Sequence, residues 1–133
     1  MTVKWTDQLV LSIIDEARKA GRNAADEKLT GLQRKGPQFA VQDGNRTVGT
    51  LLDVCGFANL KISARGKFFQ LAKKLSTNSN LRFLCTNAYR GGSLAIFDST
   101  MRQELSVNIA ACQGQAKVLE AYGIKCQIQS RID

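Results

Sequence analysis

The residues that could do chemistry in this chain are few, because it contains no histidine. This absence excludes Ser-His-Asp and Cys-His catalysis and removes the commonest general base. An enzyme built from this sequence would depend on carboxylates, Lys, Tyr or Cys alone. Asp53 and Cys55 are the candidates, since a neighbouring cation could activate the Cys55 thiol as a nucleophile. No partner base lies near them in the sequence, so we assign no catalytic residue and favour a buried thiol at Cys55.

The four cysteines stand at positions 55, 85, 112 and 126, and no two of them form a CxxC pair. Such spacing is typical of buried thiols in an intracellular protein. A zinc site built from all four cysteines stays formally open, although structural zinc sites usually take their ligands in close pairs. We therefore expect no metal and no cofactor.

The composition is that of one ordinary globular domain. The chain has 133 residues, of which 44% are hydrophobic and 23% charged, and this length is sufficient to bury a core. No apolar run approaches the ~20 residues that span a bilayer, and the first residues lack the apolar segment of a secretion signal. We expect a cytoplasmic protein that does not enter a membrane. Its net charge of +8 attracts polyanions such as nucleic acid, although a basic protein without such a partner fits equally well.

The first fifty residues predict an extension to the domain. Apolar residues at three- and four-residue spacing indicate a helix over residues 6–29, with Thr6 as its N-cap. Residues 30–50 are punctuated by glycine and by Pro37. They fit either an extra hairpin that turns at Asp43-Gly44-Asn45 or a loop without regular structure, and the sequence leaves both open.

From residue 51 onward the pattern predicts strand, helix, strand, strand, helix, strand. This order is the ferredoxin-like split βαβ arrangement, so we expect an α+β domain with a ferredoxin-like βαββαβ core over residues 51–133 and an added N-terminal helix and irregular segment. Two right-handed crossovers would place both helices on one face of the sheet and the first and third strands in its centre. The expected elements are strands at 54–62, 81–88, 93–98 and 125–132, and helices at 67–75 and from Thr100 to Tyr122.

Glycines mark two places in this predicted core. Gly56 indicates a bulge or a close backbone approach in the first strand. Arg90-Gly91-Gly92 predicts a tight hairpin, because glycine supplies the positive φ that such turns require.

The face of the sheet turned away from the helices is the candidate binding surface. Strand alternation points Ala58, Leu60 and Ile62 inward and the intervening side chains outward. Aromatic rings among cations and amides resemble, in physical terms, the platforms on which bases stack. The sequence favours a simpler alternative, in which the helix at 6–29 or a second subunit covers this side and the two phenylalanines are core. The candidate residues on this face are Phe57, Asn59, Lys61, Phe97, Lys125, Gln127, Gln129 and Arg131.

Arg65 and Lys67 extend the candidate surface to the start of the second helix. They flank Gly66, where a helix N-terminus could meet an anion. A glycine–lysine pair without the rest of a P-loop is a poor motif, so a solvated turn is the favoured alternative.

Three stretches of the sequence resemble a group of small uncharacterised proteins encoded by bacteriophages and prophages. They are Val54 to Ile62 with its Cys-Gly-Phe-Ala segment, the Gly91-Gly92-Ser93 turn, and the Ser130-Arg131-Ile132-Asp133 terminus. Asn59 stands where the group has an aromatic residue. The resemblance covers about the last eighty residues and implies a phage gene product in a bacterial cytoplasm. It brings no established activity, so it assigns no catalytic residue.

Three hypotheses for the function follow. The first is a small basic phage-type protein that binds DNA or RNA through the open sheet face, as a monomer or homodimer. The second is a non-enzymatic accessory factor that binds a host protein or sequesters a phosphorylated small molecule. The third is an enzyme that uses Asp53 or Cys55.

Overall fold

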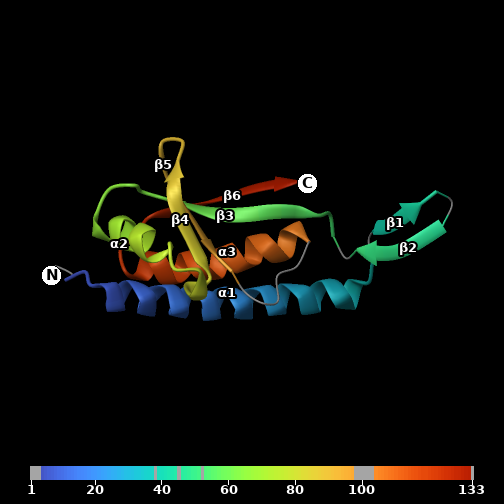
Figure 1. Ribbon diagram of the computed structural model, residues 1–133. Coiled ribbons are helices and arrows are strands. Elements are labelled where there is room, and N and C mark those ends of the chain that lie inside the picture. The colour runs from blue at the N-terminus through green and yellow to red at the C-terminus, as the bar shows by residue number, and fades with distance from the viewer. Residues whose placement is uncertain (1–3, 38, 45, 52, 98–103, 133) are drawn as a thin grey trace.

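The computed structural model describes residues 4–37, 39–44, 46–51, 53–97 and 104–132. The chain begins with a long helix and a hairpin, and continues through four further strands, two helices and a short 3-10 turn (Figure 1). The elements are α1 (Asp7–Lys35), β1 (Phe39–Asp43), β2 (Arg46–Leu51), β3 (Gly56–Ile62), α2 (Lys67–Leu75), η1 (Ser79–Leu81), β4 (Phe83–Ala88), β5 (Gly91–Ile96), α3 (Leu105–Ala121) and β6 (Cys126–Ile132).

The molecule is a mixed α+β fold arranged in layers. Strands β3 to β6 form an antiparallel sheet in the order β4-β5-β3-β6, so β3 and β5 occupy its centre as the sequence predicts. Helix α3 packs on β3 and β6, and α2 on β4. Helix α1 lies beneath α3 and α2, with the sheet on the far side of these helices (Figure 1). The β1–β2 hairpin extends beyond the end of α1.

The central strand β3 pairs with its two neighbours over different lengths. Strand β3 pairs with β6 over seven consecutive residues, from Gly56 opposite Ile132 to Ile62 opposite Cys126. It pairs with β5 over only three, from Leu60 opposite Leu94 to Ile62 opposite Gly92. Strand β5 pairs along its whole length with β4 instead. The hairpin that β4 and β5 form crosses the direction of β3 and β6 in Figure 1. The central strands therefore diverge at the end where β3 begins.

The core lies between the sheet and the helices. Leu60, Ile62 and Leu94 are buried against the helices, while Phe57 on the alternate face of β3 is exposed. Helix α1 adds Val10, Ile13 and Ile14 to the same core, which also includes Phe68, Phe69, Ala72, Phe83, Cys85, Cys112 and Leu119. Burial of these side chains provides the main favourable free energy of folding.

Two glycines bring α1 and α3 into close contact. A Cβ atom at Gly114 would lie 2.5 Å from the backbone oxygen of Ala20, and one at Gly21 would lie 2.8 Å from that of Ala111. No Cβ fits at such distances, so glycine is required at both positions.

Helix α1 is longer than the sequence predicts. Thr6 caps it as expected, its hydroxyl accepting from the backbone N–H of Leu9 at 3.1 Å. The helix continues past residue 29 to Lys35 and ends at Gly36, whose φ is 85°. Gly31 does not stop it, because an isolated glycine costs a helix only about 1 kcal/mol. Of the two alternatives for residues 30–50, the hairpin is the one observed.

The predicted reason for the β4–β5 turn is wrong, although the hairpin itself is present. Among the described residues between Ala88 and Leu94, the positive φ belongs to Arg90, at 58°, and not to a glycine. Gly91 and Gly92 are strand residues. A Cβ at Gly92 would lie 2.3 Å from the ring of Phe69, and one at Gly91 would lie 3.1 Å from the Cε atom of Lys61. These glycines therefore make room for side chains.

The two ends of α3 can be compared with the predicted ends of this helix. At its C-terminus Gly123 has a φ of 82°, and the N–H of Ile124 donates to the Leu119 carbonyl at 3.0 Å, so the helix ends at Ala121, one residue before the predicted end. The predicted helix start at Thr100 lies outside the described residues. Gly56 makes the close backbone approach that the sequence predicts, since a Cβ there would lie 2.6 Å from the Arg131 carbonyl oxygen.

Within the described part of the chain, no helix is both long and apolar enough to cross a membrane.

Candidate nucleic-acid interface

The face of the sheet opposite the helices is open to solvent among the described residues. The first form of the simpler alternative, in which the helix at 6–29 covers this face, is wrong, because α1 packs on α3 and α2 instead, whereas cover by a second subunit stays a prediction. Its apolar residues Val10, Ile13 and Ile14 enter the core from the helix side. Phe57 is consequently 57% exposed and is not a core residue.

The middle of this face is polar. Lys61 lies opposite Ser93 on β5 and Gln127 on β6, and Ser93 lies opposite Thr86 on β4. One row of four side chains thus crosses all four strands. The amide of Asn59 donates to the Ser93 hydroxyl at 2.7 Å, which fixes its orientation next to this row. Strand alternation places Gln129 on the same face, one row further along β6.

An aromatic ring and a cation meet at the end of the face where β3 begins. Phe57 lies opposite Arg131, and the guanidinium carbon of Arg131 is 6.0 Å from the centroid of the Phe57 ring. This distance is at the outer limit for a cation–π contact. Both side chains are exposed, so the ring and the guanidinium are both accessible to a ligand.

Phe97 does not join Phe57 in a continuous platform. It follows the last residue of β5, three residues beyond the end of the β3–β5 pairing, where the two strands diverge. Its backbone carbonyl accepts from Arg18 of α1 at 3.3 Å, and Arg18 also donates to the Leu81 carbonyl at 2.9 Å. Phe97 is 37% exposed and lies at the end of the hairpin that contacts α1.

Three of the predicted cations lie around the opposite end of the face, where β3 ends and β6 begins. Lys125 immediately precedes β6, while Arg65 and Lys67 stand at the turn into α2, and all three are exposed. Gly66 is the N-cap residue of α2, with a φ of 96°, and it makes no side-chain capping hydrogen bond. No ion is needed to explain this turn, so the anion hypothesis for it stays a prediction.

Tyr89 and Arg90 form a second aromatic–arginine pair that the sequence interpretation missed. They occupy the turn between β4 and β5, and the guanidinium carbon of Arg90 is 5.2 Å from the Tyr89 ring centroid. Tyr89 is 81% exposed. The turn lies at the same end of the sheet as Lys61, because Ala88 pairs with Gly91 and the side chain of Lys61 lies over Gly91. The sequence feature that could have indicated this pair is a Tyr-Arg dipeptide at a predicted hairpin turn.

The charge along the sequence is unevenly distributed, and this signal was also missed. Residues 54–97 contain no Asp or Glu, although they make up about a third of the chain. The carboxylates with described positions lie mainly on α1, such as Asp15 and Glu16, and at Glu120 near the end of α3. Strands β3 to β6 carry none. The cations of residues 54–97 are Lys61, Arg65, Lys67, Lys73, Lys74, Arg82 and Arg90.

Asp53, one of the enzyme candidates, has a structural role. Its Oδ2 atom accepts from the backbone N–H of Ser106 at 3.0 Å, in the first turn of α3. The hydroxyl and then the backbone N–H of Ser106 lower the pKa of the Asp53 carboxyl below its usual 3.8. Of these two contacts the geometry supports the backbone one, since the buried Ser106 Oγ has no hydrogen-bond partner among the described residues. Asp53 thus caps α3 from a distant part of the sequence.

The four cysteines differ in their burial. Cys55 is half-buried and its backbone forms an isolated bridge with Glu104. Cys85 and Cys112 are buried, and burial raises the pKa of each thiol to about 11. The part of the chain that the structure describes contains no group of three Cys, Asp or Glu side chains able to hold a metal ion.

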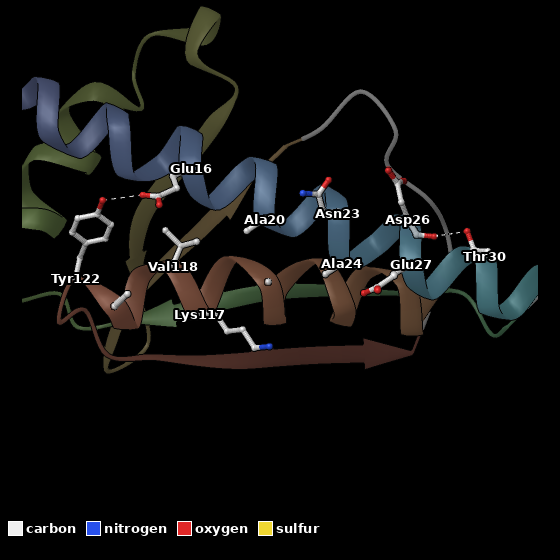
Figure 2. A pocket seen from close by; sticks show the side chains of 12 residues that line it. Glu16, Ala20, Asn23, Ala24, Asp26, Glu27, Thr30, Lys117, Val118 and Tyr122 are labelled. Carbon is white, nitrogen blue, oxygen red and sulfur yellow. Dashed lines mark hydrogen bonds between the residues drawn. The ribbon is translucent and has the colours of Figure 1, made fainter.

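A groove of about 780 Å³ between α1 and α3 is the other candidate (Figure 2). Glu16 lies at one end, where it accepts from the Tyr122 hydroxyl at 2.9 Å, and Asp26 and Glu27 lie further along α1. Lys117 is the cation among the residues that line it. The groove carries the opposite charge from the open sheet face, so a polyanion would be repelled from it.

No protein-family model, curated protein or solved structure matches this chain. The candidate interface therefore depends on the charges and contacts of this chain alone.

Proposed function

We propose that this protein binds nucleic acid through the open face of the β3–β6 sheet. The observation that carries the proposal is that the helices leave this face bare while its four strands contain no carboxylate. Lys61 and Arg131 would neutralise phosphates, and Phe57 would offer a ring for base stacking. Tyr89 and Arg90 would repeat this combination at the hairpin turn.

Single-stranded DNA or RNA fits this face better than duplex. The central row of Thr86, Ser93, Lys61 and Gln127 is flat and offers hydroxyl, amide and ammonium groups to splayed bases and sugars. Stacking on an exposed ring requires an unpaired base, since duplex bases already stack on each other. The longest helix, α1, meanwhile does not offer the cationic face that enters a major groove, since it carries both signs of charge along its length.

We also infer that Gly56–Ile132 is a ferredoxin-like βαββαβ unit of the phage-type group that the sequence resembles. The order of the elements and the central position of β3 and β5 support this topology. The stretches behind the resemblance include β3, with its exposed Phe57, and the end of β6, with Arg131. We therefore place the protein in the cytoplasm of a bacterial host, as a non-enzymatic accessory factor.

Fluorescence anisotropy with labelled oligonucleotides of about 16 nucleotides tests the proposal, since this length covers the site of one small sheet domain. Single-stranded DNA, single-stranded RNA and a matched duplex would be titrated over a range of salt concentrations. We expect binding to the single strands, with log K falling linearly as log salt rises and a slope of about 0.7 per neutralised phosphate.

Two variants with the same net charge distinguish binding by this face from binding through the overall positive charge of the protein. Lys61→Gln removes a cation from the face, while Lys19→Gln removes one from α1, where Lys19 is 3.2 Å from Asp15. The proposal requires the first variant to weaken binding and reduce the salt slope, and the second to bind almost as the parent does. Equal losses in both variants, or no binding at low salt, would refute it.

A further inference from the structure

The two edges of the β3–β6 sheet differ in their protection. Strand β4 forms one edge and is covered by α2. The hydroxyl of Ser76 donates to the Cys85 carbonyl at 3.2 Å, and the ammonium of Lys73 donates to the Asn87 amide oxygen at 3.3 Å. The first contact occupies a backbone carbonyl that another strand would otherwise use, and both contacts hold α2 beside this edge, so β4 is less open to pairing than β6.

Strand β6 forms the other edge, and there the structure describes no such cover. Its pairing with β3 runs through all seven residues from Cys126 to Ile132 without a register shift, and it contains no proline. Natural proteins protect an edge of this kind with bulges, prolines, charges or a covering segment. In β6 the four residues from Gln127 to Ser130 are uncharged. A long, regular and unprotected edge indicates a strand partner.

We propose that β6 pairs in antiparallel fashion with β6 of a second copy of this chain, about a two-fold axis at Gln129. This register is self-complementary. It places Gln129 opposite its own copy, Gln127 opposite Arg131 of the partner subunit, and Cys126 opposite Ile132 of the partner subunit. A two-fold axis at Ile128 would instead place Lys125 opposite Arg131 of the partner subunit, and two like charges directly opposite each other are destabilising.

The helix side of the β6 edge has room for a second copy. Ile132 is 65% exposed, the most exposed aliphatic side chain of the sheet, and alternation places it on the same side as the half-buried Ile128. A hollow beside Ile128 is lined by Ala110 and Ala116 of α3 and also by charged side chains, among them Lys117 and Glu120. In the proposed register Ile132 of the partner subunit would lie along this flank of α3, because Cys126 contacts the Ala116 carbonyl. The exposed Ile132 of each copy would then be shielded from solvent.

The dimer would join the two open faces side by side. A two-fold axis perpendicular to the sheet turns the same face of both copies toward the same side, giving one eight-stranded surface. This consequence rests on the proposed function, because Lys61, Phe57 and Arg131 would then be presented twice to one strand of nucleic acid. The strand pairing itself does not depend on it, so its test is made without nucleic acid.

Analytical ultracentrifugation over a range of protein concentrations gives the first test. We expect the weight-average mass to rise from 14.6 kDa toward twice that value. Ile132→Lys should stay monomeric, since it places a new charge on the edge. Leu84→Lys is the matched control, because Leu84 is a 47% exposed aliphatic residue on the other edge strand, and it should associate as the parent does.

Disulfide trapping tests the register. Residues directly opposite each other in an antiparallel pair have Cα atoms about 4.5–5.5 Å apart, which a disulfide can span. Under mild oxidation with diamide, Gln129→Cys should therefore give a covalent dimer in high yield. Gln127→Cys, on the same strand and face, should not. The proposal would be overturned by a parent protein that sediments as a monomer at about 1 mM. Equal disulfide trapping at positions 127 and 129 would overturn it as well. The β6 edge would then have to pair with a different kind of partner.

Discussion

The carboxylate of Asp53 accepts a hydrogen bond from the backbone N–H of Ser106 at 3.0 Å, across 53 residues of sequence. Beside it the N–H of Leu105 donates to the Val54 carbonyl at 2.8 Å, and the Asn108 amide donates to the Gly56 carbonyl at 2.9 Å. The segment before β3 thus satisfies N–H groups at the start of α3 that would otherwise lack partners. This arrangement couples the entry of the central strand to the helix that packs on it.

Removal of the Asp53 cap should destabilise the fold. We expect Asp53→Ala to lower the free energy of unfolding by about 1 kcal/mol, the usual effect of removing an N-cap. Asp53→Asn should retain most of the stability, because its amide oxygen can accept the same hydrogen bond. Urea unfolding followed by circular dichroism measures both variants. A loss in Asp53→Asn as large as that in Asp53→Ala would show that charge and not capping is the main contribution.

The effect of Asp53 on stability should also depend on pH. The contacts with Ser106 lower the pKa of this carboxyl in the folded state below 3.8, so folding favours the charged form. The stabilisation is therefore complete well above pH 3.8 and is lost as the pH falls through the lowered pKa of the folded state. We expect the stability difference between the parent and Asp53→Ala to be constant near pH 7 and to shrink below about pH 4. Unfolding curves at several pH values measure it.

Two glycine substitutions within helices should have opposite effects. Gly114→Ala would force a Cβ to within 2.5 Å of the Ala20 carbonyl oxygen in α1, and we expect a loss of about 1–3 kcal/mol through overpacking. Gly31→Ala introduces a Cβ with no atom within 4 Å and should stabilise α1 by about 0.5–1 kcal/mol. Thermal unfolding compares the two variants. A neutral Gly114→Ala would contradict the close contact of α1 with α3.

The buried thiols should be unreactive in the folded protein. Burial raises the pKa values of Cys85 and Cys112 to about 11, so at pH 8 roughly a thousandth of each is thiolate. We expect iodoacetamide to label neither residue under native conditions within the time that labels both in urea. Mass spectrometry of the labelled peptides measures the rates. Rapid native labelling of Cys112 would indicate that α3 opens frequently from the sheet.

Each aromatic–arginine pair should contribute separately to nucleic-acid binding. Loss of a stacking ring typically costs about 1–3 kcal/mol per base, so Phe57→Ala and Tyr89→Ala should each weaken single-strand binding by about 5- to 150-fold. Phe97→Ala should have a smaller effect, because Phe97 lies on the diverging end of the hairpin, toward α1. Anisotropy titrations at one fixed salt concentration compare the three variants. A larger loss for Phe97→Ala than for Phe57→Ala would move the interface toward α1.

Local sequence patterns predict the helices and strands and their inward and outward faces. Helix α2 spans Lys67–Leu75 as predicted, and Leu60 and Ile62 face the core while Phe57 faces solvent. These features follow from periodicity, because side chains alternate along a strand and recur every three to four residues along a helix. The predicted end of α1 at residue 29 is too early, since Gly31 resembles a stop signal locally although the helix continues through it to Lys35.

Which surfaces are left open depends instead on how the elements pack. The position of α1 against α3, and not over the sheet, depends on the fit between Gly21 and Gly114, which no periodicity in either segment encodes. The separation of Phe57 from Phe97 follows from a β3–β5 pairing of only three residues. Asp53 became a helix cap because the fold brings it to Ser106. Contacts between distant segments set all three, whereas sequence patterns report only on neighbours along the chain.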